Sequence, residues 1–332
     1  MGDSRAPCPV SRHEPQRTAR YPRAVIPGLI DVTPGPDLLV VGPLRIGWYG
    51  VGYILALIAL VLVTQREAAR RGIDPRHVTA VLVPAAILAL IGARLYHVID
   101  QFDACGLGQP CYRENLWAVV LPPYSGLGLY GGIAGAALGI FLYVRRHGIP
   151  FWRALDAVIP GTLFAQGIAR WGNFFNQELY GPPTGDAWGI AIECQFRVSP
   201  WFCPGDARLE AGALAYPVET TGFHPLFFYE SALDILGGLV ALWLGRRFPS
   251  RLRTGDVGSF WGIWYGTVRT VLETFRSGYN WTLAGGIPTA QLIGVALIAI
   301  GVVTIIWRHR GPRRDETMDQ PVVDDRPAAQ TA

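Results

Sequence analysis

The residues most able to do chemistry lie in a short segment that follows a long apolar run. This signature segment, residues 170–181, reads RWGNFFNQELYG and contains Arg170, Asn173, Asn176 and Glu178. A charged side chain at the edge of hydrocarbon is costly and usually marks a substrate or ion site. A guanidinium group with amide and carboxylate neighbours suits a phosphate-bearing head group. The alternative is an interfacial arginine that snorkels to the surface, followed by a polar loop.

A second group of charged residues lies inside a later apolar segment. Arg269, Glu273 and Arg276 are spaced i, i+4 and i+7, so a helix would carry all three on one face. A glutamate between two arginines can hold both guanidinium groups and leave one positive charge for an anionic ligand. The alternative is an ion-pair network that only holds helices together.

The elements that must position these residues are membrane-spanning helices. Of the 332 residues, 50% are hydrophobic and 16% are charged, whereas soluble domains carry roughly 25% charged residues. The apolar residues fall into blocks about 20 residues long, the length that crosses a bilayer. The expected spans are about 46–64, 78–98, 126–144, 152–171, 225–245, 257–276 and 288–307. We predict an all-α integral membrane protein with seven transmembrane helices in one domain, 41–307, and flexible tails at 1–40 and 308–332.

Arginine-rich connections indicate the orientation of these spans. They lie between spans one and two, three and four, and five and six, and after span seven. Cytoplasmic segments carry an excess of basic residues, so we place these connections and the C-terminus in the cytoplasm. The N-terminus is then outside. Five arginines in the N-terminal tail oppose this topology, because that tail would have to cross the membrane.

This topology brings the polar residues of the spans into the outer half of the membrane. Besides the two groups above, they are Tyr49, Arg94, His97, Tyr130, Gly131, His224, Tyr229 and Glu230. We infer a pocket in the outer leaflet whose ligand is anionic and lipid-borne. His97 could titrate near neutral pH, or it could be an interfacial histidine with no role. Asp234, one turn from Glu230, has either a packing or a catalytic role.

Cysteines fall in the two loops that this topology places outside, where disulfides persist. We predict the bridges Cys105–Cys111 and Cys194–Cys203; the alternative is four free thiols. Cys8 is left without a partner in the N-terminal tail. The sequence has no metal-ligand spacing of Cys or His and no phosphate- or dinucleotide-binding loop. We therefore expect no metal, no cofactor and no nucleic-acid partner.

Five motifs resemble those of a known family. WYG at 48–50, GARLYHVI at 92–99, the signature segment, HPLFFYE at 224–230 and YGTVRTVLETFR at 265–276 resemble the prolipoprotein diacylglyceryl transferases of bacteria. The resemblance covers about residues 40–307. It implies an enzyme of the bacterial plasma membrane that moves the diacylglyceryl group of phosphatidylglycerol onto the lipobox cysteine of a preprolipoprotein signal peptide. A thioether would form and glycerol phosphate would leave, at the outer leaflet and without a cofactor.

The resemblance also implies roles for single residues. Arg170 resembles the family's phosphatidylglycerol-binding arginine and Arg269 its essential arginine, which Glu273 would orient. Arginines aimed at the leaving phosphate would stabilise the charge that builds there. The phosphatidylglycerol site would include Arg170, Asn173, Asn176, Glu178, Gly181, Tyr49, Tyr130 and Gly131, supported by Arg94, Tyr229, Glu230 and Arg276.

Two positions depart from the family pattern. Many members have a histidine before the paired glycines of span three, where this chain has Tyr130, and a neutral tyrosine is a poor proton acceptor. His97, His224 or Glu178 could replace it as the base. We favour the other possibility, that the field of the arginines alone ionises the thiol, whose reference pKa is about 8.5. The arginine that usually follows the signature glycine is also absent, and Pro182 and Pro183 stand after Gly181.

Two other functions stay open. A transporter or flippase for anionic lipids would use arginines to guide the anion, but it needs polar residues through the whole bilayer depth. The inner halves of the spans are nearly free of charge apart from Asp156 and Asp234, which argues against such a path. An inactive homologue that only binds phosphatidylglycerol is suggested by Tyr130 alone.

Overall fold

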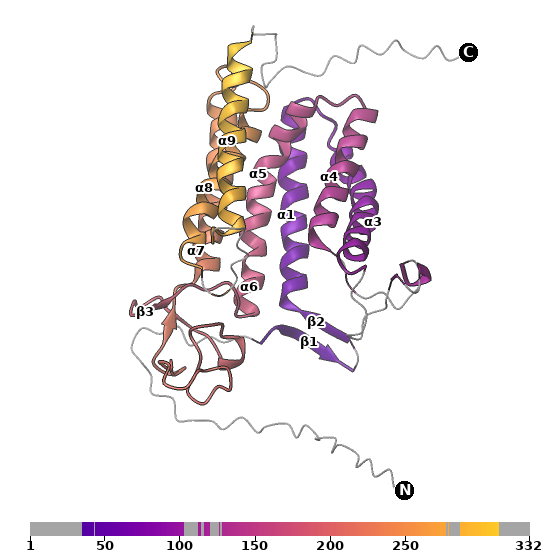
Figure 1. The fold of residues 1–332 in the computed structure, drawn as a ribbon. Helices are drawn as coiled ribbons and strands as arrows, with labels where there is room; N and C mark the ends of the chain where they lie inside the picture. The colour runs from indigo at the N-terminus through magenta and orange to yellow at the C-terminus, as the bar shows by residue number, and fades with distance from the viewer. Residues whose placement is uncertain are drawn as a thin grey trace, which may run out of the picture.

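Seven long helices form the body of the protein (Figure 1). The computed structural model describes residues 35–42, 44–102, 112–113, 116–119, 126, 128–276, 278 and 286–311. The long helices are α1 (Trp48–Arg70), α3 (Leu82–Asp100), α4 (Leu129–Arg146), α5 (Phe151–Ala169), α7 (Leu226–Arg247), α8 (Asp256–Glu273) and α9 (Thr289–Arg310). Each coincides with one of the expected spans, and the short helix α2 (Arg76–Ala80) leads directly into α3. The helical prediction is therefore confirmed for the body of the chain.

Four helical segments of the described chain are long and apolar enough to cross a membrane. They are Trp48–Arg70, Arg76–Asp100, Leu226–Arg247 and Thr289–Arg310. The remaining long helices, α4, α5 and α8, have 18 or 19 residues each. α5 packs against α1, α7 and α8, so much of its surface is covered by neighbouring helices. Large apolar side chains such as Ile54, Leu90 and Val303 are exposed on the outside of the bundle, as a surface in contact with lipid requires.

The prediction of an all-α protein misses two small antiparallel sheets. β1 (Asp37–Val41) and β2 (Leu44–Gly47) form a hairpin that leads into α1. The second sheet has the order β3-β5-β4, with β3 (Pro183–Thr184), β5 (Gly222–Phe223) and β4 (Ile190–Ala191). Strands of two residues carry no readable alternation, so sequence patterns could not reveal them. β1 starts inside the expected tail 1–40, and α9 ends at Arg310, inside the expected tail 308–332.

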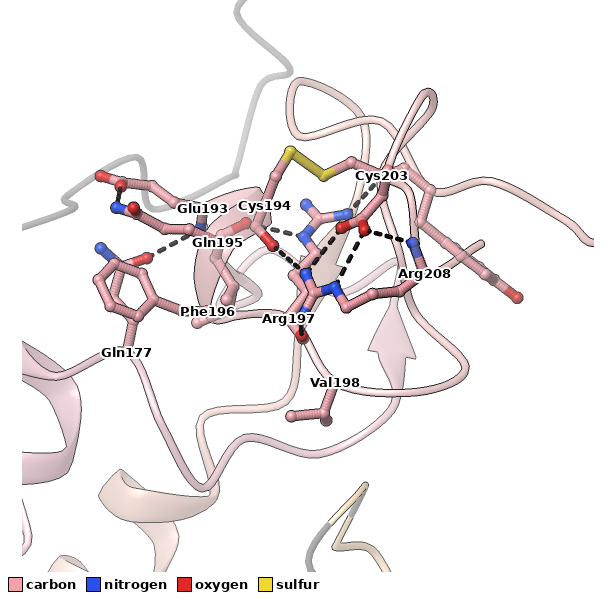
Figure 2. Close-up of a disulfide and its surroundings, with 12 residues drawn as sticks. Gln177, Glu193, Cys194, Gln195, Phe196, Arg197, Val198, Cys203 and Arg208 are labelled. Atoms are coloured by element: carbon pink, nitrogen blue, oxygen red, sulfur yellow. Dashed lines mark hydrogen bonds and ion pairs between the residues drawn. A yellow bond between two sulfur atoms is a disulfide. The ribbon is translucent and has the colours of Figure 1, made fainter. Parts of the chain in front are cut away.

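Residues 182–223, called the head below, form a compact unit at one end of the bundle (Figure 1). In its core, the buried side chains of Ile190, Ile192 and Phe223 cluster with Tyr180 of the signature segment. The predicted bridge Cys194–Cys203 is present, with an S–S distance of 2.03 Å (Figure 2). The other predicted bridge, Cys105–Cys111, lies outside the described residues, as does Cys8.

The arginine-rich connections meet at the opposite end of the bundle. Glu67 of α1 accepts contacts from Arg71 at 2.6 Å and from Arg246 of α7 at 2.8 Å. Arg253 donates to the carbonyl oxygens of Arg308 and Gly311, which ties the α7–α8 connection to the end of α9. Basic charge is thus concentrated at the end away from the head, as the charge pattern of the sequence predicts.

Glycines allow α3 and α4 to approach closely. A Cβ atom added at Gly92 would lie 2.2 Å from the carbonyl oxygen of Gly131, and one at Gly135 would lie 2.0 Å from that of Leu88. Because these obstacles are backbone atoms, they cannot rotate out of the way. Close helix packing therefore requires glycine at these positions.

Candidate active site

Arg170 lies at the junction of two helices. α5 ends at Ala169, and the five-residue helix α6 (Trp171–Phe175) follows Arg170 directly. A Cβ atom at Gly172 would lie 2.7 Å from the ring of Tyr49. Glycine is therefore needed for α6 to pack against the start of α1. This junction brings the first signature residue next to the tyrosine expected at the same site.

Three arginines and two glutamates form a continuous arginine–glutamate chain across three parts of the fold. Arg170 Nε lies 2.6 Å from Glu230 Oε2, and Arg269 Nη1 lies 2.9 Å from Glu230 Oε1. Arg269 Nη2 then contacts Glu273 Oε2 at 2.8 Å, and Arg276 Nη1 contacts the same oxygen at 3.4 Å. The expectation that Glu273 holds two arginines is confirmed. The link through Glu230 was not foreseen, because Glu230 was expected only as a supporting residue.

In the arginine–glutamate chain, the glutamate side chains are more deeply buried than the arginine side chains. The side chains of Glu230 and Glu273 are 8% and 2% exposed, whereas those of Arg170 and Arg269 are 20% and 15% exposed. The glutamates therefore fix the guanidinium groups from the protein interior and leave part of each arginine side chain accessible. With all five groups ionised, the chain carries one net positive charge. Such fixed, partly exposed cations can bind an anion without rearranging.

The polar residues of the signature segment form a second cluster beside Arg170. Glu178 Oε1 accepts a hydrogen bond from Asn173 Nδ2 at 2.8 Å and a longer one from Asn176 Nδ2 at 3.4 Å. Gln177 and Leu179 adopt left-handed backbone conformations, with φ of 52° and 58°. Such conformations are costly for residues other than glycine. They turn the chain sharply enough to fold Glu178 back over α6, so Asn173, Asn176 and Glu178 do lie together as expected.

Gly181 lies where the start of α7 meets the end of α8. Its N–H donates to the carbonyl oxygen of His224 at 2.9 Å, and the N–H of His224 donates to that of Pro182 at 3.1 Å. A Cβ atom at Gly181 would lie 3.0 Å from His224 Cβ and 3.2 Å from the carbonyl oxygen of Phe275. The prolines that replace the family's arginine continue into β3, which pairs with β5.

His224 and Tyr229 are joined to the head by their side chains. His224 Nδ1 lies 3.2 Å from the hydroxyl of Tyr229, which accepts a hydrogen bond from Trp188 Nε1 at 2.9 Å. The main chain of His224 therefore holds it next to the signature segment, and its side chain is linked through Tyr229 to Trp188 of the head.

The remaining expected site residues belong to the α3–α4 pair. The Tyr130 ring packs 5.9 Å from that of Tyr96, and the His97 ring lies 6.0 Å from that of Tyr112. The Arg94 guanidinium lies 5.3 Å from the centre of the same Tyr112 ring. A Cβ atom at Gly131 would lie 2.1 Å from the carbonyl oxygen of Gly92, so helix packing is sufficient to explain this glycine.

Sequence reasoning missed a pocket of about 420 Å³ at the boundary between the signature segment and the head. Asn176 and Glu178 line it on one side, and Arg197 and Arg208 of the head line it on another. No periodicity or motif marks these arginines, because they lie in irregular loops. In the sequence they are marked by position alone: Arg197 lies inside the loop that Cys194 and Cys203 close, and Arg208 follows shortly after it.

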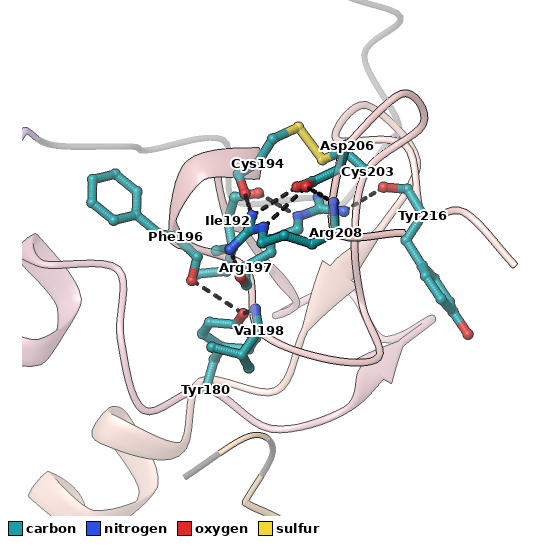
Figure 3. A network of polar contacts seen from close by, with 10 residues as sticks. All are labelled: Tyr180, Ile192, Cys194, Phe196, Arg197, Val198, Cys203, Asp206, Arg208 and Tyr216. Carbon is teal, nitrogen blue, oxygen red and sulfur yellow. Dashed lines mark hydrogen bonds and ion pairs between the residues drawn. A yellow bond between two sulfur atoms is a disulfide. The ribbon is translucent and has the colours of Figure 1, made fainter. Parts of the chain in front are cut away.

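Two arginines organise the head (Figure 3). Arg197 is 1% exposed, donates from Nε to the Ile192 carbonyl oxygen at 2.8 Å, and also donates to that of Tyr216. Burial lowers the pKa of Arg197. Arg208 contacts both carboxylate oxygens of Asp206, at 2.7 and 3.0 Å, and donates to the carbonyl oxygen of Cys194 at 3.1 Å. The side-chain hydrogen bonds from Arg208 lower the pKa of Asp206 to about 2, so this pair is ionised at neutral pH.

Comparison with known proteins gives consistent matches along the chain. The family model described as prolipoprotein diacylglyceryl transferase matches residues 36–307. Three relatives, all named phosphatidylglycerol–prolipoprotein diacylglyceryl transferase, are similar over most of their lengths. The relative from Chloroflexus aggregans is 34% identical over 87% of this chain and 93% of its own. The relatives from Synechococcus elongatus and Streptococcus pneumoniae are each 33% identical over 83% of this chain, and over 88% and 94% of their own lengths.

Proposed function

Because this protein belongs to the prolipoprotein diacylglyceryl transferase family, we propose that the side chains of its arginine–glutamate chain catalyse the transfer for which the family is named. The enzyme transfers the diacylglyceryl group of phosphatidylglycerol to prolipoproteins. The geometry supports this function through one observation above all. Arg170 and Arg269, on separate helices, are held by the two oxygens of the single carboxylate of Glu230.

The proposed reaction displaces a phosphate ester with a thiolate. The sulfur of the lipobox cysteine attacks the glycerol carbon of phosphatidylglycerol that carries the phosphate. A C–S bond forms, the C–O bond to the phosphate breaks, and glycerol phosphate leaves with the electron pair. Because negative charge moves from the sulfur to the leaving phosphate, guanidinium groups placed at that phosphate lower the barrier.

The residues divide between binding and catalysis in this proposal. Arg170 and Arg269 bind the phosphate and stabilise its charge, and Glu230 and Glu273 hold them in position. Around the glycerol head group lie Tyr49, Asn173, Asn176, Glu178 and Gly181, with Tyr130 offering its hydroxyl to the phosphate from α4.

The thiol must lose its proton before it attacks, either to a side-chain base or to water under a strong positive field. The net positive charge of the arginine–glutamate chain raises the thiolate fraction in this proposal. Of the two candidate histidines, His224 is the better placed proton acceptor, because its main chain is hydrogen-bonded to Gly181 and Pro182. The contacts of His97 are with Tyr112 and Gly126 on the side of α3 and α4.

We place the reaction at the outer leaflet of the bacterial plasma membrane. The signature segment and the head lie at the end of the bundle opposite to the arginine-rich connections (Figure 1). Cytoplasmic ends of membrane proteins are enriched in arginine, so the head end would face outward. Phosphatidylglycerol would enter laterally from the lipid.

The test uses the full-length protein in detergent with phosphatidylglycerol and a peptide that carries a lipobox cysteine. Mass spectrometry should detect a diacylglyceryl adduct on the peptide together with released glycerol phosphate. Arg269→Ala should lower turnover by about 10²–10³-fold, the cost of removing one preorganised donor. The matched control is Arg146→Ala. Arg146 is an exposed arginine at the end of α4, on the side of the bundle away from the head. A wild-type protein that binds phosphatidylglycerol by native mass spectrometry but gives no adduct would instead favour a binding or transport role.

A further inference from the structure

Three side chains at the border between the head and the bundle are hydrogen-bonded in a row, called the aromatic network below. Trp188 of the head donates from Nε1 to the Tyr229 hydroxyl at 2.9 Å, and the same hydroxyl lies 3.2 Å from His224 Nδ1. The second sheet brings these residues together. β4 and β5 are antiparallel with Ile190 opposite Phe223, so the residues before β4 lie beside those that follow β5.

The chemistry of these groups determines the direction of both hydrogen bonds. An indole N–H can only donate, so the Tyr229 oxygen accepts from Trp188. The hydroxyl hydrogen of Tyr229 then needs an acceptor, and within the described part of the chain that acceptor is His224 Nδ1. His224 Nδ1 therefore presents its lone pair, and the hydrogen of the neutral imidazole is on Nε2. In the other tautomer, the Tyr229 oxygen would accept twice and its own hydrogen would have no acceptor among the described residues.

The aromatic network adjoins the proposed lipid site on two sides. Tyr229 directly precedes Glu230, whose carboxylate holds two arginines of the arginine–glutamate chain. The His224 carbonyl oxygen accepts the Gly181 N–H at 2.9 Å, which places His224 against the signature segment. The His224 ring is half-buried, and its Nε2 has no hydrogen-bond partner in the described part of the chain. A donor with a fixed hydrogen is thus available beside the arginines.

Such a donor suits an anion, because anions accept the stronger hydrogen bonds. We propose that Trp188, acting through Tyr229, keeps the hydrogen of His224 on Nε2, and that Nε2 donates it to the phosphate-bearing head group of phosphatidylglycerol. Trp188 is then a positioning residue, and His224 binds the substrate. This inference rests on the proposed function.

The inference also selects between the routes open to the thiol proton. His224 has the better position of the two candidate histidines, but its Nδ1 already accepts from Tyr229 and its Nε2 already carries a hydrogen. It therefore does not take the thiol proton. The positive field of the arginine–glutamate chain ionises the thiol, and the proton passes to water. This route requires no substitute for the histidine that Tyr130 replaces.

The first test replaces His224 in the full-length enzyme and measures transfer from phosphatidylglycerol to a lipobox peptide. In His224→Gln the amide nitrogen takes the place of Nε2, and in His224→Asn it takes the place of Nδ1. Neither amide is a base at neutral pH. We expect His224→Gln to stay within about threefold of the wild-type KM for phosphatidylglycerol and His224→Asn to raise it about tenfold, the cost of one hydrogen bond to a charged group. A fall in kcat of about 10²-fold or more in both variants, typical of a missing base, would overturn the inference.

The second test is a double-mutant cycle that begins with Trp188. Trp188→Phe removes the indole donor and frees the tautomer of His224, so the KM for phosphatidylglycerol should rise about three- to tenfold at a similar kcat. In the His224→Gln background the same change should have little further effect, because glutamine has no ring tautomer to fix. Equal effects in both backgrounds would mean that Trp188 only stabilises the fold, which would contradict the inference. The matched control is Trp243→Phe, at an exposed tryptophan near the other end of α7, which should keep the wild-type KM.

A spectroscopic measurement on the wild type needs no change in the site. Nitrogen NMR of the isotope-labelled imidazoles should show a hydrogen on Nε2 of His224 and none on Nδ1, with the signals assigned by their loss in His224→Gln. Active enzyme with the hydrogen on Nδ1 would overturn the inference alone. Wild-type protein that forms no diacylglyceryl adduct would overturn the proposed function, and the inference with it.

Discussion

At the scale of single residues, Glu230 unites a site whose parts come from three helices. One oxygen of its carboxylate faces Arg170 at the end of α5, and the other faces Arg269 in α8. The two guanidinium groups lie 2.6 and 2.9 Å from the same carboxylate. Without that carboxylate between them, two positive charges held so close together would repel each other. The buried position of Glu230 leaves the arginines on the accessible side. Glu230 is therefore a positioning residue for both.

Glu230→Gln should lower kcat strongly. An amide has one acceptor oxygen and presents an NH₂ group to the other arginine, so it releases either Arg170 or Arg269. We expect a fall of about 10²-fold, comparable to the loss of one preorganised donor. The transfer assay measures it, with the exposed Glu210→Gln in the head as the matched control. Wild-type turnover in Glu230→Gln would show that the link between the arginines is unimportant.

Asp234→Asn should leave turnover nearly unchanged. Asp234 is 1% exposed, and neither of its carboxylate oxygens has a hydrogen-bond partner in the described part of the chain. Substitution by the neutral amide of the same shape thus removes no hydrogen bond. We expect a change below about tenfold, since no hydrogen bond of Asp234 is lost. A decrease of about 10²-fold in the same assay would assign Asp234 a part in proton transfer.

At the scale of elements, the α3–α4 pair shows how a family motif can serve packing. Gly131 was expected in the head-group site, yet it lies against the backbone of Gly92. Gly131→Ala should separate the two helices and lower the thermal unfolding temperature in detergent. Gly50→Ala, with no atom within 4 Å of the added Cβ, should leave it unchanged or raise it slightly. Equal unfolding temperatures for the two variants would refute the close packing of α3 and α4.

The loop closed by Cys194 and Cys203 should govern the stability of the head. The two cysteines are 9 positions apart, and closing a loop of this size stabilises the folded state by about 2–3 kcal/mol. We expect the paired change Cys194→Ser and Cys203→Ser to expose the head to limited proteolysis. Cys8→Ser in the N-terminal tail is the control. Protease resistance equal to that of the wild type would mean that the apolar core and the hydrogen bonds maintain the head without the disulfide.

At the scale of the whole molecule, the sequence predicts positions along the chain better than contacts between helices. Apolar blocks of bilayer length locate the seven long helices, and the charged residues at their ends identify the end that contains the site. The pairing of Arg170 with Arg269 could not be predicted, because it depends on how α5, α7 and α8 pack. The pocket could not be predicted either, since Gln177 and Arg197 owe their positions to a left-handed turn and an irregular loop.

The orientation of the bundle yields a prediction for the cell. An epitope inserted at Gly212, an exposed head glycine with φ of 85°, should bind antibody on intact spheroplasts. The same epitope at Gly148, in the turn between α4 and α5, should bind only after the membrane is permeabilised. The physical reason is that arginine-rich ends of membrane proteins are generally retained in the cytoplasm, and Gly148 lies at the arginine-rich end of this bundle. The reverse pattern of accessibility would contradict the outward-facing site.

Joint action of the two linked arginines is tested most directly by single-turnover transfer to a lipobox peptide. The rates to compare are those of the wild type, Arg170→Ala, Arg269→Ala and the double variant. Residues that act as one unit give strongly non-additive losses. We expect each single variant to lose about 10²–10³-fold and the double variant to be scarcely slower than the worse of the two. Losses that multiply in the double variant, or single variants as fast as the wild type, would contradict a shared site built around Glu230.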